Sequence, residues 1–422
     1  MTDEFTPDIP AMSAPVTVSR AADPLASRLR GFGTTIFAEM TALAAETGAI
    51  NLGQGFPDSD GAPEIAEAAV AAIRAGHNQY PPGAGIPELR RAIAEHQRRY
   101  YGLEVDPDSQ VLVTTGATEA IAATILALCD PGDEVIAFEP FYDSYAACIA
   151  MTGAVRRVVT LRPPEYSFDI DTVRSLVNPH TKVLLLNTPH NPTGKVFSRS
   201  EIGLLAGLCR DHDLIMVTDE VYEHLVFDGL EHVPAATLPD MFDRTVTISS
   251  AGKTFSYTGW KIGWVTGPEV LVNAVRTAKQ FLTYVSGAPL QHGIAHALGM
   301  PDSVITDLRD SLQSKRDRIV AGLRAAGFGV FPPAGTYFVT ADIRPLGAAD
   351  GYQFCRELPG RCGVVAVPTQ VFYDDVEAGR PLIRFAFCKR DDVIDEAVRR
   401  LARWGAGAVE HGAGAVAERG PG

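Results

Sequence analysis

Short apolar segments alternate with longer stretches of helical periodicity through the middle of the chain. The apolar segments are VLVTT (111–115), EVIAFE (134–139), KVLLLNT (182–188), LIMVTDE (214–220) and TVTISS (245–250). The stretches with helical spacing are 63–75, 84–101, 117–128, 199–212 and 303–326, with Gly or Pro near their ends. Such an alternation predicts an α/β fold, in which a mostly parallel sheet is covered by helices on both faces.

The pattern changes after Gly327. Strand-like segments follow there, at 328–343, 363–368 and 382–388, and a last helix is expected at about 390–404. We interpret residues 60–310 as a large domain, and 25–59 with 311–405 as a smaller α+β domain. The ends, 1–24 and 406–422, are rich in Pro, Ser, Thr and Ala or in Gly and Ala, which is typical of mobile tails.

Polar or glycine residues end each expected strand of the central region. The pairs are Thr115-Gly116, Glu139-Pro140, Asn187-Thr188, Asp219-Glu220 and Ser249-Ser250. Because ligands of open α/β sheets bind outside the carboxyl ends of the strands, we expect these residues to converge on one site.

Composition excludes several classes of function. The formal charge of -14 argues against a nucleic-acid surface. No apolar run is long enough for a membrane span, and the acidic N-terminus is unlike a secretory signal, so we expect a soluble cytoplasmic protein. The six cysteines form no CxxC pair, which predicts buried thiols and neither a disulfide framework nor a metal site.

The segment TISSAGKTFSYTGWKIGW (247–264) carries the most specific chemistry. A single lysine is ordinarily a solvated surface residue, but Lys253 follows small hydroxyl and glycine residues in an apolar, Trp-containing segment. A buried amine with a lowered pKa is a good Schiff-base nucleophile. Lys261 follows eight positions later, and together with Ser250 it is suited to hold a phosphate.

Three further segments place polar groups where an apolar strand ends or runs. Asp219 ends one strand, where an aspartate has either a functional role or the ordinary role of a turn residue. Asn191 lies in the loop NTPHNPTGK (187–195). Arg384 lies inside LIRFAFC, where either a structural salt bridge or a bidentate carboxylate ligand would compensate its charge. In TTGATEAI (114–121) a helix begins at glycine, and free N–H groups at a helix N-terminus bind phosphate.

Together these motifs resemble class I and II aminotransferases, which are pyridoxal-5'-phosphate (PLP) enzymes of fold type I. The resemblance covers about residues 25–405 and implies a seven-stranded type of sheet. It departs at Lys261, where the family often has Arg. It implies that Lys253 holds PLP as a Schiff base. It implies cofactor contacts for Gly116, Ala117, Thr118, Tyr142, Asn191, Asp219, Tyr222, Ser250 and Lys261, and substrate contacts for Gly55, Asn191 and Arg384.

The same resemblance implies roles within that set. Asp219 would bond the pyridine nitrogen, Tyr142 would stack on the ring, and Arg384 would clamp the substrate carboxylate. Tyr80 would reach the cofactor phosphate of a neighbouring subunit, which implies a homodimer. An amino acid donor and a 2-oxo acid acceptor, with 2-oxoglutarate favoured, would react in a ping-pong cycle.

The resemblance is greatest to the group that contains kynurenine aminotransferases and N-succinyldiaminopimelate aminotransferases. We expect the latter activity, in lysine biosynthesis, with Arg28 or Arg30 as candidates to read the distal acidic end. The alternatives are a kynurenine, glutamine or methionine aminotransferase and a cysteine-S-conjugate β-lyase. A PLP-fold transcription regulator would need a further basic domain, for which the sequence before the fold leaves no room. A non-enzymatic scaffold would have no reason to combine Lys253, Asp219, Asn191 and Arg384.

Overall fold

The computed structural model describes residues 25–33 and 35–417. The segment 1–24, expected as a tail, lies outside the described residues. Within the described ranges, no helix is both long and apolar enough to cross a membrane.

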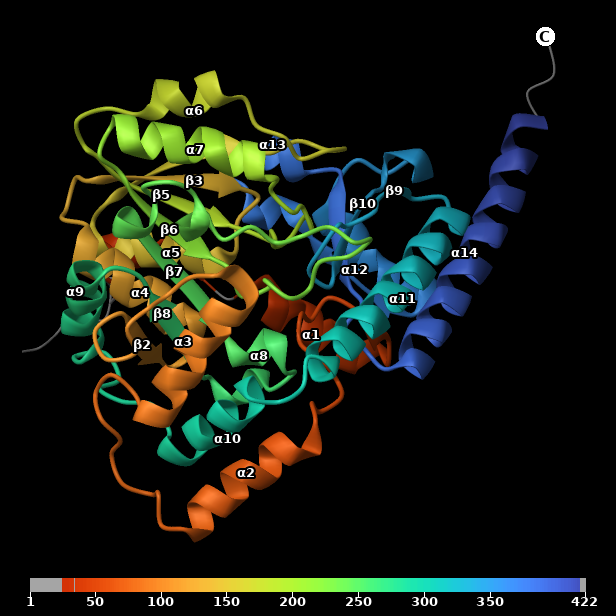
Figure 1. Ribbon diagram of the computed structural model, residues 1–422. Coiled ribbons are helices and arrows are strands. Elements are labelled where there is room, and N and C mark those ends of the chain that lie inside the picture. The colour runs from red at the N-terminus through yellow and green to blue at the C-terminus, as the bar shows by residue number, and fades with distance from the viewer. Residues whose placement is uncertain (1–24, 34, 418–422) are drawn as a thin grey trace, which may run out of the picture.

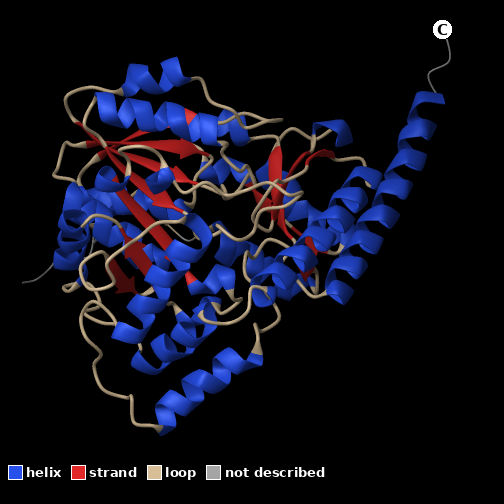
Figure 2. Cartoon of the chain, in the orientation of Figure 1, coloured by secondary structure: helices blue, strands red, loops and turns tan. Residues whose placement is uncertain are grey.

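A seven-stranded sheet forms the centre of the larger part of the molecule (Figures 1 and 2). Its strands are β2 (Val111–Thr114), β3 (Glu134–Glu139), β4 (Val155–Thr160), β5 (Thr181–Asn187), β6 (Ile215–Asp219), β7 (Thr245–Ser250) and β8 (Gly263–Thr266). Their spatial order is β2-β8-β7-β6-β5-β3-β4, and every pair is parallel except those that β8 makes with β2 and β7. The expected seven-stranded, mostly parallel sheet is confirmed.

Helices cover both faces of this sheet because its central strands are apolar on both sides. On β5, Val183 and Leu185 join the core beneath α4, α5 and α9, whereas Leu184 and Leu186 join the core beneath α7. Near β2 and β8 the second face is covered by α2, α3 and α10. These helices are α2 (Pro63–Arg74), α3 (Pro87–Tyr101), α4 (Gly116–Leu128), α5 (Asp143–Thr152), α6 (Ile170–Leu176), α7 (Arg199–Asp211), α9 (Glu269–Lys279) and α10 (Ala288–Leu298).

A smaller antiparallel sheet follows in the C-terminal part, in the order β12-β13-β10-β9. Its strands are β9 (Gly329–Phe331), β10 (Phe338–Asp342), β12 (Val367–Pro368) and β13 (Leu382–Ala386). Around it lie α1 (Ile36–Thr47), α11 (Ser303–Ala325), α12 (Gly351–Cys362), α13 (Val376–Gly379) and α14 (Asp391–Ala417). Helices α11 and α14 lie side by side at the edge of the molecule (Figure 1).

The N-terminal segment packs with this C-terminal part rather than with the large sheet. Strand β1 (Ile50–Asn51) pairs in parallel with β11 (Val364–Val365), and Met40 of α1 shares a core with Phe354 of α12. We therefore propose the division of the chain into 60–310 and 25–59 with 311–405. The boundary at 310/311 falls inside the continuous helix α11.

Element boundaries differ from the sequence predictions for local reasons. Helix α3 begins at Pro87 rather than at 84, since proline without an N–H fits the first turn. Helix α7 begins where expected, with a capping box between Ser198 and Glu201. Helix α14 runs to Ala417, well beyond the expected end near 404. The glycines of 406–417 suggest a tail. Its alanines have the highest helix propensity of all residues and favour the helix that the structure has there.

Candidate active site

The residues that end the central strands surround one cavity of about 260 Å³. It lies at the carboxyl ends of β5, β6 and β7 and is closed on the other side by β10 and β13. Of the residues predicted for the site, those lining it are Gly55, Gly116, Ala117, Thr118, Tyr142, Asn191, Asp219, Tyr222, Ser250, Lys253, Lys261 and Arg384. Four of the five strand-end pairs each contribute one residue to the cavity lining, namely Gly116, Asn187, Asp219 and Ser250. Glu139 does not, because its carboxylate accepts hydrogen bonds from Thr160 and from the backbone N–H of Asp374.

Lys253 lies in the short helix α8 (Ala251–Thr254), directly after β7. Its amine Nζ donates a hydrogen bond to the Tyr337 hydroxyl at 2.8 Å, and that hydroxyl donates to the carbonyl oxygen of Gly55 at 2.7 Å. Desolvation lowers the pKa of Lys253 to about 8, against the opposing effect of Asp219. A larger fraction of this amine is therefore neutral at pH 7 than of an exposed lysine, as a nucleophilic amine requires.

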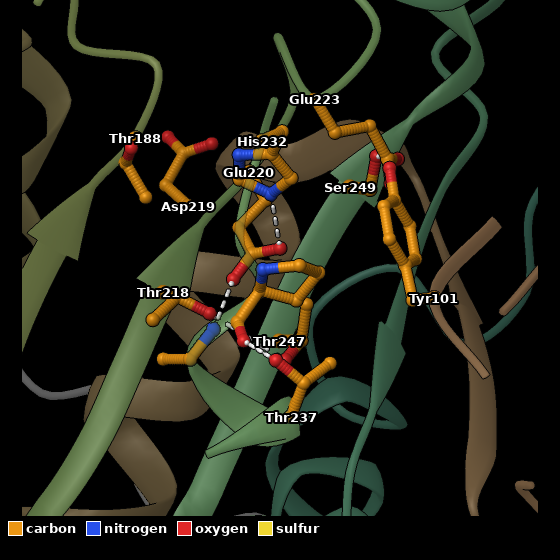
Figure 3. A network of polar contacts seen from close by, with 12 residues as sticks. Tyr101, Thr188, Thr218, Asp219, Glu220, Glu223, His232, Thr237, Thr247 and Ser249 are labelled. Atoms are coloured by element: carbon orange, nitrogen blue, oxygen red, sulfur yellow. Dashed lines mark hydrogen bonds and ion pairs between the residues drawn. The ribbon is translucent and has the colours of Figure 1, made fainter. Parts of the chain in front are cut away.

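Asp219 ends β6 and is buried (Figure 3). Its carboxylate accepts hydrogen bonds from the Tyr145 hydroxyl and from the N–H of Val221. The Asn187 side chain donates to the Asp219 carbonyl oxygen at 2.8 Å. Burial raises the pKa of Asp219, and the hydrogen bond from Tyr145 opposes that rise. A carboxylate held in this way is suited to pair with a protonated ring nitrogen in the cavity.

We propose as the phosphate end of the cavity the region formed by the N-terminus of α4 and the segment after Lys253. Gly116 begins α4 with φ of +74°, and a Cβ on Gly116 would lie 3.2 Å from the amine Nζ of Lys261. Ser250 and Thr118 line the same cavity. Free backbone N–H groups, hydroxyls and one cation are a donor set that fits a phosphate dianion. Lys261 contributes a single point charge where Arg would contribute a bidentate fork.

Arg384 is buried in β13, 2% exposed, and carries no salt bridge within the described residues. Its guanidinium donates to the Asn191 side-chain oxygen and to the Gly53 carbonyl oxygen, both at 3.1 Å, while Nε has no partner among the described residues. Its Cζ lies 4.1 Å from the ring centroid of Phe338. Burial lowers the pKa of Arg384 to about 10. A structural salt bridge does not account for this cation, so it is available to a ligand carboxylate.

Two predicted residues have surroundings that sequence reasoning did not anticipate. Gly55 was expected to leave room for the substrate, yet a Cβ there would lie 2.6 Å from Phe338 Cζ, so packing alone requires the glycine. Tyr80 lies outside the cavity, 81% exposed, in edge contact with Tyr284 at 5.5 Å between ring centroids.

Three residues that support the site were not singled out as site residues from the sequence. Tyr145 holds Asp219, Asn187 orients the loop that carries Asn191, and Tyr337 binds Lys253. Asn187 was marked as a strand-end polar residue, which was a usable signal. In the sequence, Tyr145 in EPFYDSY and Tyr337 in GTYF resemble ordinary aromatic residues of the core. The partners of their hydroxyl groups lie in other segments, so the local sequence does not indicate them.

Comparison with known proteins agrees with this geometry. The model of the family "Aminotransferase class I and II" matches residues 47–401. A probable N-succinyldiaminopimelate aminotransferase of Mycobacterium tuberculosis is 52% identical over 89% of this chain and 97% of its own length. The methionine aminotransferase of Escherichia coli is 38% identical over 89% of this chain and 97% of its length, and mouse kynurenine–oxoglutarate transaminase 3 is 38% identical over 90% of each.

Solved structures place the fold in the same group. The N-succinyldiaminopimelate aminotransferase structure from M. tuberculosis superposes with a TM-score of 0.88 at 52% identity, covering 90% of this chain and 100% of that one. An E. coli methionine aminotransferase structure gives 0.87 at 38% identity, covering 90% and 99%. The chain is an aminotransferase and belongs to the class I and II aminotransferase family.

Proposed function

We propose that this aminotransferase holds PLP in the cavity around Lys253 and transfers the α-amino group of N-succinyl-LL-diaminopimelate to 2-oxoglutarate. Members of its family depend on PLP. The single observation that carries the cofactor assignment is the donor set of the cavity. It combines an amine of lowered pKa, the buried carboxylate of Asp219, and phosphate donors at Gly116 and Lys261.

Each residue has a distinct task in this proposal. When bound, PLP supplies an electron sink for the electrons released at the substrate α-carbon. Lys253 would hold the cofactor covalently, and once released its amine would accept and return the proton of the substrate α-carbon. Asp219 would hold a proton on the pyridine nitrogen. Arg384 and Asn191 fix the substrate carboxylate so that the α-hydrogen lies toward the amine.

Tyr222, Tyr142 and Ser250 complete the proposed cofactor contacts. Tyr222 and Asn191 would meet the phenolic oxygen, and Tyr142 would stack on the ring. Ser250 would bind the phosphate with Ala117 and Thr118. Both tyrosines line the cavity, with Tyr222 in edge contact with Tyr337 at 5.2 Å between ring centroids.

The substrate proposal rests on similarity to the M. tuberculosis protein at 52% identity, compared with 38% for the methionine and kynurenine relatives. The distal acid of N-succinyl-LL-diaminopimelate requires a cation besides Arg384. Arg28, at the exposed η1 (Ser27–Leu29), and the adjacent Arg30 do not line the cavity. Helix η1 contacts α5, whose first residue follows Tyr142 of the cavity lining.

We also propose a cytoplasmic homodimer. The exposed aromatic residues Tyr80, Phe281 and Tyr284 support a dimer, because a second copy would cover them and would bring Tyr80 toward the neighbouring phosphate end. The cytoplasmic location rests on the sequence interpretation alone.

A panel of amino donors tests the substrate. Purified protein loaded with PLP is mixed in single turnovers with N-succinyl-LL-diaminopimelate, kynurenine, glutamine and methionine, and the cofactor absorbance is followed. We expect the first donor to react with a kcat/KM at least about 100-fold above the others, and 2-oxoglutarate to restore the spectrum. Arg28→Gln and Arg30→Gln should lower kcat/KM for that donor and leave methionine unchanged.

Other outcomes identify the alternatives. A faster reaction with methionine or kynurenine would show that the amino donor differs from the proposed one, while the activity would still be that of an aminotransferase. Release of pyruvate and ammonia from a cysteine S-conjugate, faster than amino transfer, would identify a β-lyase.

A further inference from the structure

A cluster of histidine and carboxylate groups lies behind the cavity, on the side that the proposed reaction does not use. His96 comes from α3, and Glu223 with His224 from the turn after β6. One ligand atom from each residue can be chosen so that all three lie within 4.8 Å of one another. Asp219 and Tyr222 of the same turn line the cavity, whereas Glu223 and His224 do not.

We propose that His96, Glu223 and His224 form a binding site for a divalent ion of the zinc class. Two imidazoles and one carboxylate are a ligand set that Zn²⁺ and its neighbours in the transition series prefer, whereas Mg²⁺ and Ca²⁺ take oxygen ligands. Cysteine spacing alone predicts no metal site in this sequence. His96 and Glu223 are 127 positions apart in the sequence, so only the fold brings them together.

The charge of Glu223 is the first support for this site. Glu223 is 4% exposed and forms no ion pair with Lys or Arg in the described part of the chain. An ionised carboxylate that is buried without a permanent cation is costly, and a bound metal ion would supply the missing charge.

The two histidines lie next to each other with a ring nitrogen of each facing the other. Their Nε2 atoms lie 2.7 Å apart and share one proton. Two nitrogens bound to one tetrahedral zinc lie about 3.4 Å apart, so side-chain movements below about 1 Å would exchange the shared proton for an ion.

Gln97 gives a second, independent indication. Its Nε2 lies 3.4 Å from Nδ1 of His96, while its Oε1 is buried with no hydrogen-bond partner among the described residues. The two ends of an amide are assigned from their hydrogen bonds, and turning this amide over brings Oε1 to His96 Nδ1. Nδ1–H then donates to Oε1, which leaves the Nε2 lone pair of His96 directed at the ion. Metal-bound histidines are held in this way by an outer acceptor.

The surroundings of Glu223 match the same pattern. Its carboxylate accepts hydrogen bonds from the hydroxyl of Tyr101, at 2.7 Å, and from that of Ser249, and Figure 3 shows these three side chains together. Each carboxylate oxygen keeps a lone pair for a metal. The ring of Tyr100 packs against both histidines, and His224 is partly exposed.

Binding at this site would join α3 to the turn that carries Asp219. Ser249, which bonds Glu223, precedes Ser250 of the proposed phosphate end. We therefore assign the ion a structural role, in which it stabilises the back of the site and takes no part in amino transfer.

Isothermal titration of Zn²⁺ into tag-free, chelator-treated, PLP-loaded protein tests the site. We expect one ion per chain, a higher Tm with Zn²⁺, and affinity reduced about 100-fold in His96→Gln and His224→Gln and about 10-fold in Gln97→Leu. His77→Gln is the matched control. It alters the histidine pair His77 and His292, whose rings lie 4.2 Å apart and which belongs to no cluster of three metal-ligating groups among the described residues.

Absence of binding by the unaltered protein would overturn the proposal, as would equal affinity in His96→Gln and the unaltered protein. Should a variant fail to fold, the absorption spectrum of Co²⁺ bound to the unaltered protein decides: bands of a site with nitrogen ligands support the proposal, and the spectrum of hydrated Co²⁺ contradicts it.

Discussion

The amine of Lys253 and the hydroxyl of Tyr337 are joined by a hydrogen bond of 2.8 Å. The two residues come from different parts of the fold, Lys253 from helix α8 directly after β7 of the large sheet, and Tyr337 from the position before β10 of the small sheet. The same hydroxyl donates to the Gly55 carbonyl oxygen. Tyr337 thus links the Lys253 amine to the Gly55 backbone, and we propose that it is a positioning residue for Lys253.

Removing that hydroxyl should slow proton transfer more than it weakens substrate binding. In Tyr337→Phe we expect kcat to fall roughly tenfold with KM little changed, because one hydrogen bond worth about 1.4 kcal/mol no longer orients the amine. Single-turnover rates with α-deuterated donor measure this, and a larger isotope effect is expected. An unchanged kcat would show that the Tyr337 hydroxyl does not orient the Lys253 amine for proton transfer.

The pKa of Lys253 sets the pH dependence of cofactor capture. Because desolvation lowers the pKa from 10.5 to about 8, the neutral amine predominates above pH 8. The rate at which apoprotein binds PLP covalently should therefore rise as pH increases to about 8 and then level off. Stopped-flow absorbance measures this rate. A rise in this rate that continues through pH 10 would show that Lys253 has the pKa of an ordinary lysine.

Arg384 should not be replaceable by lysine. Arg384→Lys keeps the charge but loses the fork that is held by Asn191 and Gly53. We expect kcat/KM for the amino donor to fall about 100-fold, roughly 3 kcal/mol, while PLP still binds. Arg390→Lys, on the surface, is the matched control. Equal kcat/KM in the two variants would argue against the proposal that Arg384 binds the substrate carboxylate.

The close approach of Gly263 to the start of α4 makes a steric prediction. A Cβ at Gly263 would lie 2.7 Å from the carbonyl carbon of Gly116, whereas nothing lies within 4 Å of a Cβ at Gly259. Gly263→Ala should lower stability by about 1–3 kcal/mol and weaken PLP binding, because the phosphate end must shift. Thermal unfolding and PLP titration of both variants measure these effects. If the Gly263→Ala protein bound PLP as tightly as Gly259→Ala and were equally stable, the result would contradict the proposed phosphate end.

The sequence was sufficient for the large sheet and for twelve of the residues that line the cavity. Strand β5 is a run of apolar residues that ends at Asn187, and Lys253, Asp219 and Arg384 each interrupt apolar surroundings with a charge. These signals are local. The supporting groups are not local: Tyr145 is recognisable only through Asp219, and Tyr337 only through Lys253, 84 residues away. The cluster of His96 with Glu223 is likewise a product of the fold.

The attachment point of the cofactor is the most direct test of the account. Protein loaded with PLP is treated with borohydride, digested and mapped by mass spectrometry. We predict a reduced cofactor adduct on the peptide that contains Lys253, and none in Lys253→Ala. An adduct on Lys261 or another lysine, or no adduct in the unaltered protein, would contradict the assignment of Lys253 and of the cavity around it.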